Sequence, residues 1–133
     1  MSYKIDTIGY ALKKLNPASP KYFIPAMQRP FVWGKQDIIS LFESIYLGFP
    51  IGATLVWNTA YDNPEDLGAN RVYLFPRDYD KNMSRVQVHL DPGTELTLIL
   101  DGQQRLTSLN IGIRGEWVDN RAIQYKMYFD PRI

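Results

Sequence analysis

The fold of this chain is organised around one stretch, LTLILDGQQRLT at residues 96–107. An apolar run that favours a β-strand ends at Asp101, turns at Gly102 and continues into a segment with helical spacing. Apolar residues recur at helical intervals from Leu106 onward, so we expect a helix over residues 103–113. The polar residues of this stretch therefore lie where a buried strand meets the N-terminus of a helix.

A junction of this kind offers unpaired backbone N–H groups and the positive end of a helix dipole, which suit a phosphate. We assign Gly102 and the amides that follow it to a phosphate cradle, and Arg105 to phosphate oxygens. Asp101 is the best-placed carboxylate for holding Mg²⁺ or orienting a water, and Gln103 and Gln104 are candidates to position that water. The alternative is structural: Asp101 caps the helix or pairs with an arginine, and the amides are solvated.

A second polar cluster lies far upstream, in IPAMQRPFVW at residues 24–33. Prolines on both sides restrict the loop, which lowers the entropy cost of presenting Gln28 and Arg29. A guanidinium group binds phosphate oxygens in a bidentate manner, and a glutamine can bond a base edge, a ribose or a water. Phe31 and Trp33 are candidates to stack on a base, although large aromatic residues more often pack in a core.

A third segment, GFPIG at residues 48–52, links a predicted helix to a predicted strand. Its two glycines allow close approach of the backbone to a ligand or to another segment. We assign Pro50 and Gly52 to the wall of the same pocket. The alternative is that this segment is only a tight connection between the two elements.

The remaining elements follow from the spacing of apolar residues, and together they predict one α+β domain over residues 1–133. The strand at 53–57 is predicted to be buried on both faces, and DPGT at 91–94 is a turn that could close a hairpin onto the strand ending at Leu100. Further helices are expected at 4–15 and 35–47, and further strands at 21–24, 71–75, 85–90 and 123–129.

Composition excludes several functions. The chain has no cysteine, which rules out disulfides, Cys-ligated zinc and thiol catalysis, and its net charge of +1 gives no general basic field. A nuclease centre that needs two histidines is also excluded, because His89 is alone, and we interpret it as a strand residue. No run is long enough to span a membrane and no signal peptide is visible, so we expect a cytosolic protein without a membrane partner. The abrupt end at Ile133 suggests a domain cut from a longer protein.

The order of these clusters resembles one prokaryotic family, the N-terminal domain of GmrSD-type modification-dependent restriction endonucleases. The resemblance covers residues 5–130 and is most distinctive in the DGQQR string preceded by the Gln-Arg-Pro-aromatic loop. More distantly, the layout is similar to the ParB/sulfiredoxin superfamily. Sulfiredoxin chemistry needs a cysteine, so that branch does not apply. The matching segments are IP at 24–25, QRPF at 28–31, LFESI at 41–45, GFPIG at 48–52 and LDGQQRL at 100–106.

The resemblance implies a ParB-like regulatory domain that binds and hydrolyses a nucleoside triphosphate with Mg²⁺ in a cytoplasmic prokaryotic restriction or phage-defence protein. The full-length protein would bind DNA, and an HNH-type nuclease region farther along the chain or on a partner would cut it. Two alternatives from other classes stay open. One is a non-catalytic DNA-binding module that grips a DNA backbone or a modified group with the same loops. The other is a scaffold whose polar cluster is structural.

Overall fold

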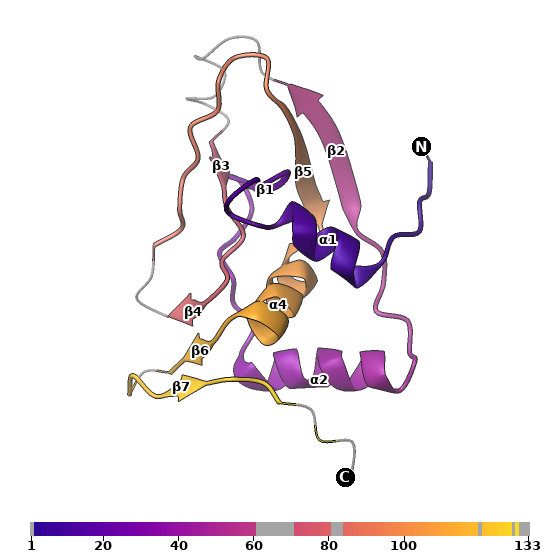
Figure 1. Ribbon diagram of the computed structural model, residues 1–133, viewed down its shortest axis with the longest axis vertical. Helices are drawn as coiled ribbons and strands as arrows, with labels where there is room; N and C mark the ends of the chain where they lie inside the picture. Colours follow the sequence, from indigo (N-terminus) through magenta and orange to yellow (C-terminus); the bar gives the residue numbers. More distant parts are fainter. Residues whose placement is uncertain (1, 61–70, 81–83, 120, 129, 131–133) are drawn as a thin grey trace.

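A computed structural model of the chain describes residues 2–60, 71–80, 84–119, 121–128 and 130. Within these ranges the chain forms three helices and seven short strands, as expected for an α+β fold (Figure 1). In chain order they are α1 (Ile8–Lys14), β1 (Tyr22–Pro25), α2 (Lys35–Tyr46), β2 (Leu55–Ala60), β3 (Val72–Tyr73), β4 (Tyr79–Asp80), β5 (Glu95–Asp101), α4 (Gln103–Arg114), β6 (Trp117–Val118) and β7 (Gln124–Tyr125).

The larger sheet has the strand order β2-β5-β1-β3. Strand β5 pairs antiparallel with β2 and parallel with β1, where Tyr22 lies opposite Thr97. Parallel strands end at the same edge of a sheet. The loop that leaves β1 at Pro25 and the junction that leaves β5 at Asp101 therefore start side by side.

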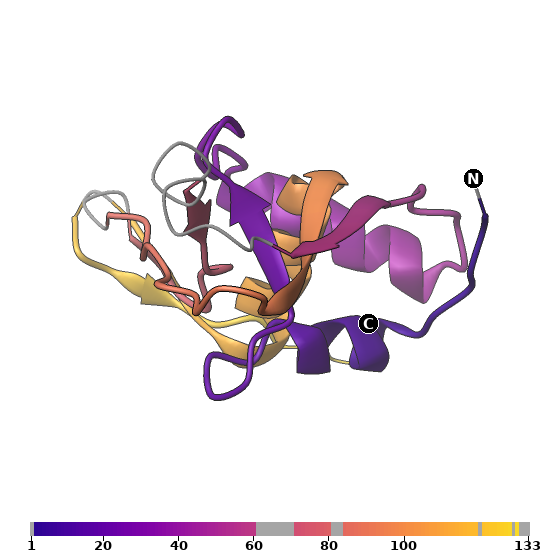
Figure 2. The ribbon, with the colours of Figure 1, turned by 90° about the horizontal axis from the view of Figure 1, so that it is seen from above.

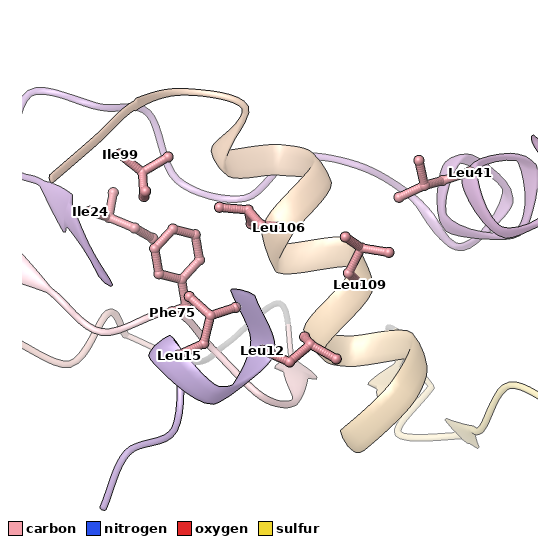
Figure 3. Close-up of a cluster of buried hydrophobic side chains, with 8 residues drawn as sticks. All are labelled: Leu12, Leu15, Ile24, Leu41, Phe75, Ile99, Leu106 and Leu109. Carbon is pink, nitrogen blue, oxygen red and sulfur yellow. The ribbon is translucent and has the colours of Figure 1, made fainter. Parts of the chain in front are cut away.

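The main core lies between this sheet and the helices. Helix α4 lies between α1 and α2 and contacts both (Figure 1 and Figure 2). An added Cβ at Gly112 of α4 would lie 2.4 Å from the ring of Phe42 of α2, so these two helices approach closely. Figure 3 shows the buried side chains that fill the core: Leu12, Leu15, Ile24, Leu41, Phe75, Ile99, Leu106 and Leu109.

The predicted helices at 35–47 and 103–113 are confirmed, and the predicted helix at 4–15 is shorter than expected. It starts at Ile8 because the side chain of Thr7 accepts a hydrogen bond from the backbone N–H of Tyr10 and caps the helix. Ile5, which has the right spacing for the apolar face, is wholly exposed. Spacing alone therefore placed the start of this helix too early.

The prediction that the strand at 53–57 is buried on both faces is wrong. Strand β2 begins at Leu55 and lies at the edge of the sheet, where it pairs with β5. Leu55, Val56 and Trp57 are 49%, 43% and 52% exposed. Apolar β-favouring residues fit an edge strand as well as a central one, so composition could not separate the two cases.

The segment at 85–90 was predicted as a strand but forms only an isolated bridge between Gln87 and Tyr73. The predicted turn at 91–94 is present, with the N–H of Thr94 donating to the carbonyl of Asp91. It closes no hairpin, because the partners of β5 are β2 and β1.

The strand predicted at 123–129 is reduced to β7, and residue 129 lies outside the described residues. Strand β7 belongs to a second sheet with the order β4-β6-β7. Aromatic side chains dominate that sheet: the rings of Tyr79 and Trp117 stack at 5.4 Å between centroids.

Candidate functional site

The two polar loops meet at the edge of the sheet where β1 and β5 end. Together they line a cavity of about 240 Å³, although they lie more than 70 residues apart in the sequence. This cavity gathers most of the side chains singled out from the sequence. Its lining residues are Gln28, Arg29, Trp33, Asp101, Gly102, Gln103, Gln104 and Arg105.

The side-chain amides of Gln28 and Gln103 form a relay with a fixed direction. The Nε2 of Gln28 donates to the carbonyl of Leu100 at 2.9 Å, and its Oε1 accepts from the Nε2 of Gln103 at 3.2 Å. The Nε2 of Gln103 also donates to the carbonyl of Arg29 at 3.2 Å. Backbone carbonyls only accept hydrogen bonds, so neither amide can be reversed. In this orientation the Oε1 of Gln103, a residue only 6% exposed, is a buried acceptor that has no hydrogen-bond partner among the described residues.

Gln104 holds the upstream loop against the start of α4. Its Oε1 accepts from the backbone N–H of Val32 at 3.1 Å, and its Nε2 donates to the carbonyl of Pro30 at 3.3 Å. The alternative in which the amides are merely solvated is therefore wrong. Within the described part of the chain Gln104 connects the two loops rather than reaching freely into the cavity.

Arg105 lines the cavity and also fastens the segment before β2. Its Nη1 donates to the carbonyl of Ile51 and its Nη2 to the carbonyl of Ala53, each at 2.5 Å. Gly52 lies between these acceptors with φ +95°, and an added Cβ there would lie 1.9 Å from Nη1. Gly102 has φ +90°, and its added Cβ would lie 3.0 Å from Nη2. The guanidinium group thus leaves no room for a side chain at Gly52, whereas at Gly102 the positive φ and the Oγ1 of Thr54, 2.9 Å from the added Cβ, restrict the position as well.

Asp101 ends β5 and is exposed, and its Oδ1 accepts from the N–H of Gly102 at 2.9 Å. The N-cap residue of α4 is Gly102 without a side-chain cap, so the capping alternative for Asp101 is wrong. Among the described residues neither Asp101 nor Arg29 forms an ion pair. The side chain of Arg29 is exposed at the cavity rim and makes no side-chain hydrogen bond within these ranges.

The described residues contain no group of three or more carboxylate or histidine side chains that could hold a metal ion. Within the part of the chain that the structure describes, Asp101 is the one carboxylate that lines the cavity. Mg²⁺ beside a nucleotide is commonly held by one or two carboxylates together with phosphate oxygens and waters. The residues present therefore fit a magnesium ion that arrives with its phosphate ligand and do not fit one held by protein alone.

The two aromatic candidates lie in different surroundings. Trp33 lines the cavity, whereas Phe31 is not among the described residues that line it, and the ring of Phe31 packs edge-on against Tyr79 at 5.4 Å between centroids. Pro50 lines a second hollow of about 310 Å³, which shares Trp33 and Arg105 with the cavity.

Sequence reasoning missed two features of this region. Arg85 lies over the ring of Tyr73 at 4.2 Å and donates to the carbonyl of Gln28 at 2.9 Å, which fixes the upstream loop from outside. Helix α2 contributes Asp37 and Ser40 to the second hollow. A signal for α2 existed, because its polar residues at three- and four-residue intervals share one helix face.

Comparison with known proteins gives a family and a relative. A sequence profile described as the N-terminal domain of GmrSD restriction endonuclease matches residues 11–132. An uncharacterized protein of Methanocaldococcus jannaschii is 37% identical over 90 residues, which cover 65% of this chain and 13% of that protein. The match thus spans a small part of that relative's length. In the described ranges no helix has both the length and the apolar character needed to cross a bilayer.

Proposed function

The chain belongs to the family of GmrSD restriction endonuclease N-terminal domains, and from this premise we propose that it binds a nucleoside triphosphate and hydrolyses it. One observation carries the proposal: two loops with the residue types that bind phosphate line a single cavity. The parallel pairing of β1 and β5 gives a physical reason for their meeting.

The charge and hydrogen-bonding groups of the cavity suit a polyanion. Arg29 has no ion pair in the described part of the chain, so its guanidinium group is available to a ligand. The guanidinium group of Arg105 donates two of its N–H groups to backbone carbonyls, and its other N–H groups can donate to phosphate oxygens. The N-terminus of α4 adds backbone N–H groups and the positive end of a helix dipole.

Hydrolysis needs a positioned water and neutralisation of charge on the terminal phosphate. Asp101 supplies an exposed carboxylate at the cavity, and we assign it as the acceptor for a hydrogen atom of that water. The Oε1 of Gln103 has no hydrogen-bond partner within the described residues, but it is buried, so we assign Gln103 to holding the loop of Arg29 beside the water rather than to contacting the water. Mg²⁺, held by Asp101 and phosphate oxygens, would supply the charge neutralisation. Water adds to the terminal phosphorus while its bond to the bridging oxygen breaks, which yields a nucleoside diphosphate and inorganic phosphate.

We further propose that this activity regulates DNA cleavage in a prokaryotic cytoplasm. The cleavage itself would belong to an HNH-type nuclease region of the longer protein or of a partner, and DNA would be bound through the complete assembly.

The test measures thermal stability and phosphate release with each of the four common nucleoside triphosphates and Mg²⁺. We expect at least one nucleotide to raise the melting temperature and to be hydrolysed. Arg29→Ala should weaken nucleotide binding by about tenfold or more without changing the stability of the free protein. Lys13→Ala is the matched control, because it removes one positive charge from an exposed position on α1 that lines neither hollow.

Two outcomes would contradict the proposal. The first is that no nucleotide changes the melting temperature or releases phosphate. The second is that DNA alone stabilises the chain with a steep dependence on salt, which would favour the DNA-binding alternative.

A further inference from the structure

We infer that the second hollow, beside α2, receives the nucleoside part of the ligand whose phosphates lie in the cavity. This inference rests on the proposed function and adds a base and sugar site to it. Trp33 and Arg105 line both the cavity and the α2 hollow, so the two spaces adjoin at a common wall formed by these two side chains. Together they reach well into the size range of small-molecule sites, roughly 300–1,000 Å³.

The common wall is fixed in place. Arg105 is held by the carbonyls of Ile51 and Ala53, and Trp33 packs on the main core. Gln104 holds the backbone of the loop that carries Trp33, through the N–H of Val32. A ligand that lies along Trp33 and Arg105 and reaches into both spaces therefore meets a preformed surface and needs little ordering of the protein.

The two spaces differ in chemistry. The cavity is lined by amides, a carboxylate and two guanidinium groups, which suits phosphates. The α2 hollow combines apolar walls from Leu41, Pro50 and Ile51 with the hydroxyl groups of Ser40 and Ser44. Apolar walls with a few placed polar groups are typical of a site for a flat heterocycle and its sugar.

Asp37 sets the direction of the ligand. Its carboxylate lines the α2 hollow, and its Oδ2 accepts from the backbone N–H of Gly34 at 2.8 Å. A carboxylate repels phosphate, but it accepts hydrogen bonds from the N–H groups of a base or the hydroxyl groups of a ribose. The cavity also contains a carboxylate, Asp101, but two arginines line it, whereas Arg105 alone among the described arginines lines the α2 hollow beside Asp37. The balance of charge therefore directs the phosphates to the side of Arg29 and the nucleoside to the side of α2.

The test compares inorganic tripolyphosphate with the four nucleoside triphosphates by titration calorimetry without Mg²⁺. We expect at least one nucleotide to bind about tenfold or more tightly than tripolyphosphate, because stacking and hydrogen bonding of the base add to phosphate binding. Ser40→Phe should fill the α2 hollow, weaken nucleotide binding by about tenfold and leave tripolyphosphate binding unchanged.

Ile39→Phe is the control, because it places the same ring at an exposed position of α2 that does not line the hollow. It should change neither affinity. Ser40→Leu, with a smaller side chain, should give an intermediate loss and serves if Ser40→Phe fails to fold.

The inference is overturned if tripolyphosphate and all four nucleotides bind equally well, or if Ser40→Phe weakens both ligand types to the same degree or neither of them. In those cases the cavity would still bind phosphate and the proposed function would stand. If neither tripolyphosphate nor any nucleotide binds, the proposed function fails and the inference fails with it.

Discussion

Two arginines line the same cavity, but they are held in different ways. Arg105, at the start of α4, donates to two backbone carbonyls and fixes the segment around Gly52. Arg29, in the proline-flanked loop, is exposed and has no ion pair in the described part of the chain. The guanidinium group of Arg105 therefore forms part of the cavity wall, and that of Arg29 is available to bind a ligand in the cavity.

This difference has a consequence for mutagenesis. Loss of Arg105 should change stability and binding together, whereas loss of Arg29 should change binding alone. A drop in activity by itself would not separate the two roles. Each variant therefore needs a measurement of the free energy of unfolding beside the measurement of ligand affinity.

Arg105→Ala should have the largest effect. It removes two hydrogen bonds from a charged donor, each worth about 1.5–3 kcal/mol, so the free energy of unfolding should fall by about 3 kcal/mol in urea titration. Arg105→Lys keeps the charge but not the fork, and should recover only part of the loss. An Arg105→Ala variant as stable as the unmodified protein would show that these two hydrogen bonds contribute nothing to the free energy of unfolding.

Gly52→Ala should have the next largest effect. The added Cβ would overlap the guanidinium group of Arg105, and φ of +95° is itself unfavourable for alanine, so we expect a loss of about 2 kcal/mol. Gly48→Ala is a close control, because Gly48 has φ +78° and no atom of the described residues lies within 4 Å of the added Cβ. Equal losses in the two variants would mean that contact with Arg105 is not the cause.

Asp101→Ala should change stability by about 1 kcal/mol or less, since one exposed hydrogen bond to Gly102 is lost. We expect phosphate release to be abolished while the fold is retained, because Asp101 is the carboxylate of the cavity. Glu95→Ala, at the opposite end of β5, removes an exposed carboxylate without touching the cavity and should leave turnover unchanged. Unaltered turnover in Asp101→Ala would remove this residue from the chemistry.

The smallest effect concerns an arginine outside the cavity, Arg121, which pairs with Asp119 at 3.0 Å. Burial raises the pKa of Asp119, but hydrogen bonds from the N–H of Ile123 and from Arg121, together with the charge of Arg121, outweigh it and lower the pKa from 3.8 to about 2. The folded state therefore gains stability above pH 3.8, and this gain is lost as the pH falls toward 2.

Comparing the acid unfolding of Asp119→Asn with that of the unmodified protein measures this contribution. The variant should lack the corresponding pH dependence and should bind nucleotide as the unmodified protein does. A change in nucleotide affinity would show that this surface pair is coupled to the cavity.

The residues that line the cavity could be singled out from the sequence because each of the two polar clusters lies in one short stretch. The turn at Gly102 and the polar residues after it are readable from one strand–helix junction. The exposure of β2 could not be predicted, since an edge strand and a central strand share the same apolar composition. The hydrogen bonds by which Arg105 holds the segment before β2 could not be predicted either, because their acceptors are backbone carbonyls some 50 residues upstream. Every residue has a backbone carbonyl, so the amino-acid type does not reveal which residues accept these hydrogen bonds.

A shared phosphate site requires Arg29 and Arg105 to contact one ligand at the same time. Side-chain NMR of the two guanidinium groups during titration with a non-hydrolysable nucleoside triphosphate tests this directly. We predict that the Nε–H resonances of both arginines shift along one binding curve with a single dissociation constant. Shifts in only one arginine, or two curves with different constants, would contradict a shared phosphate site.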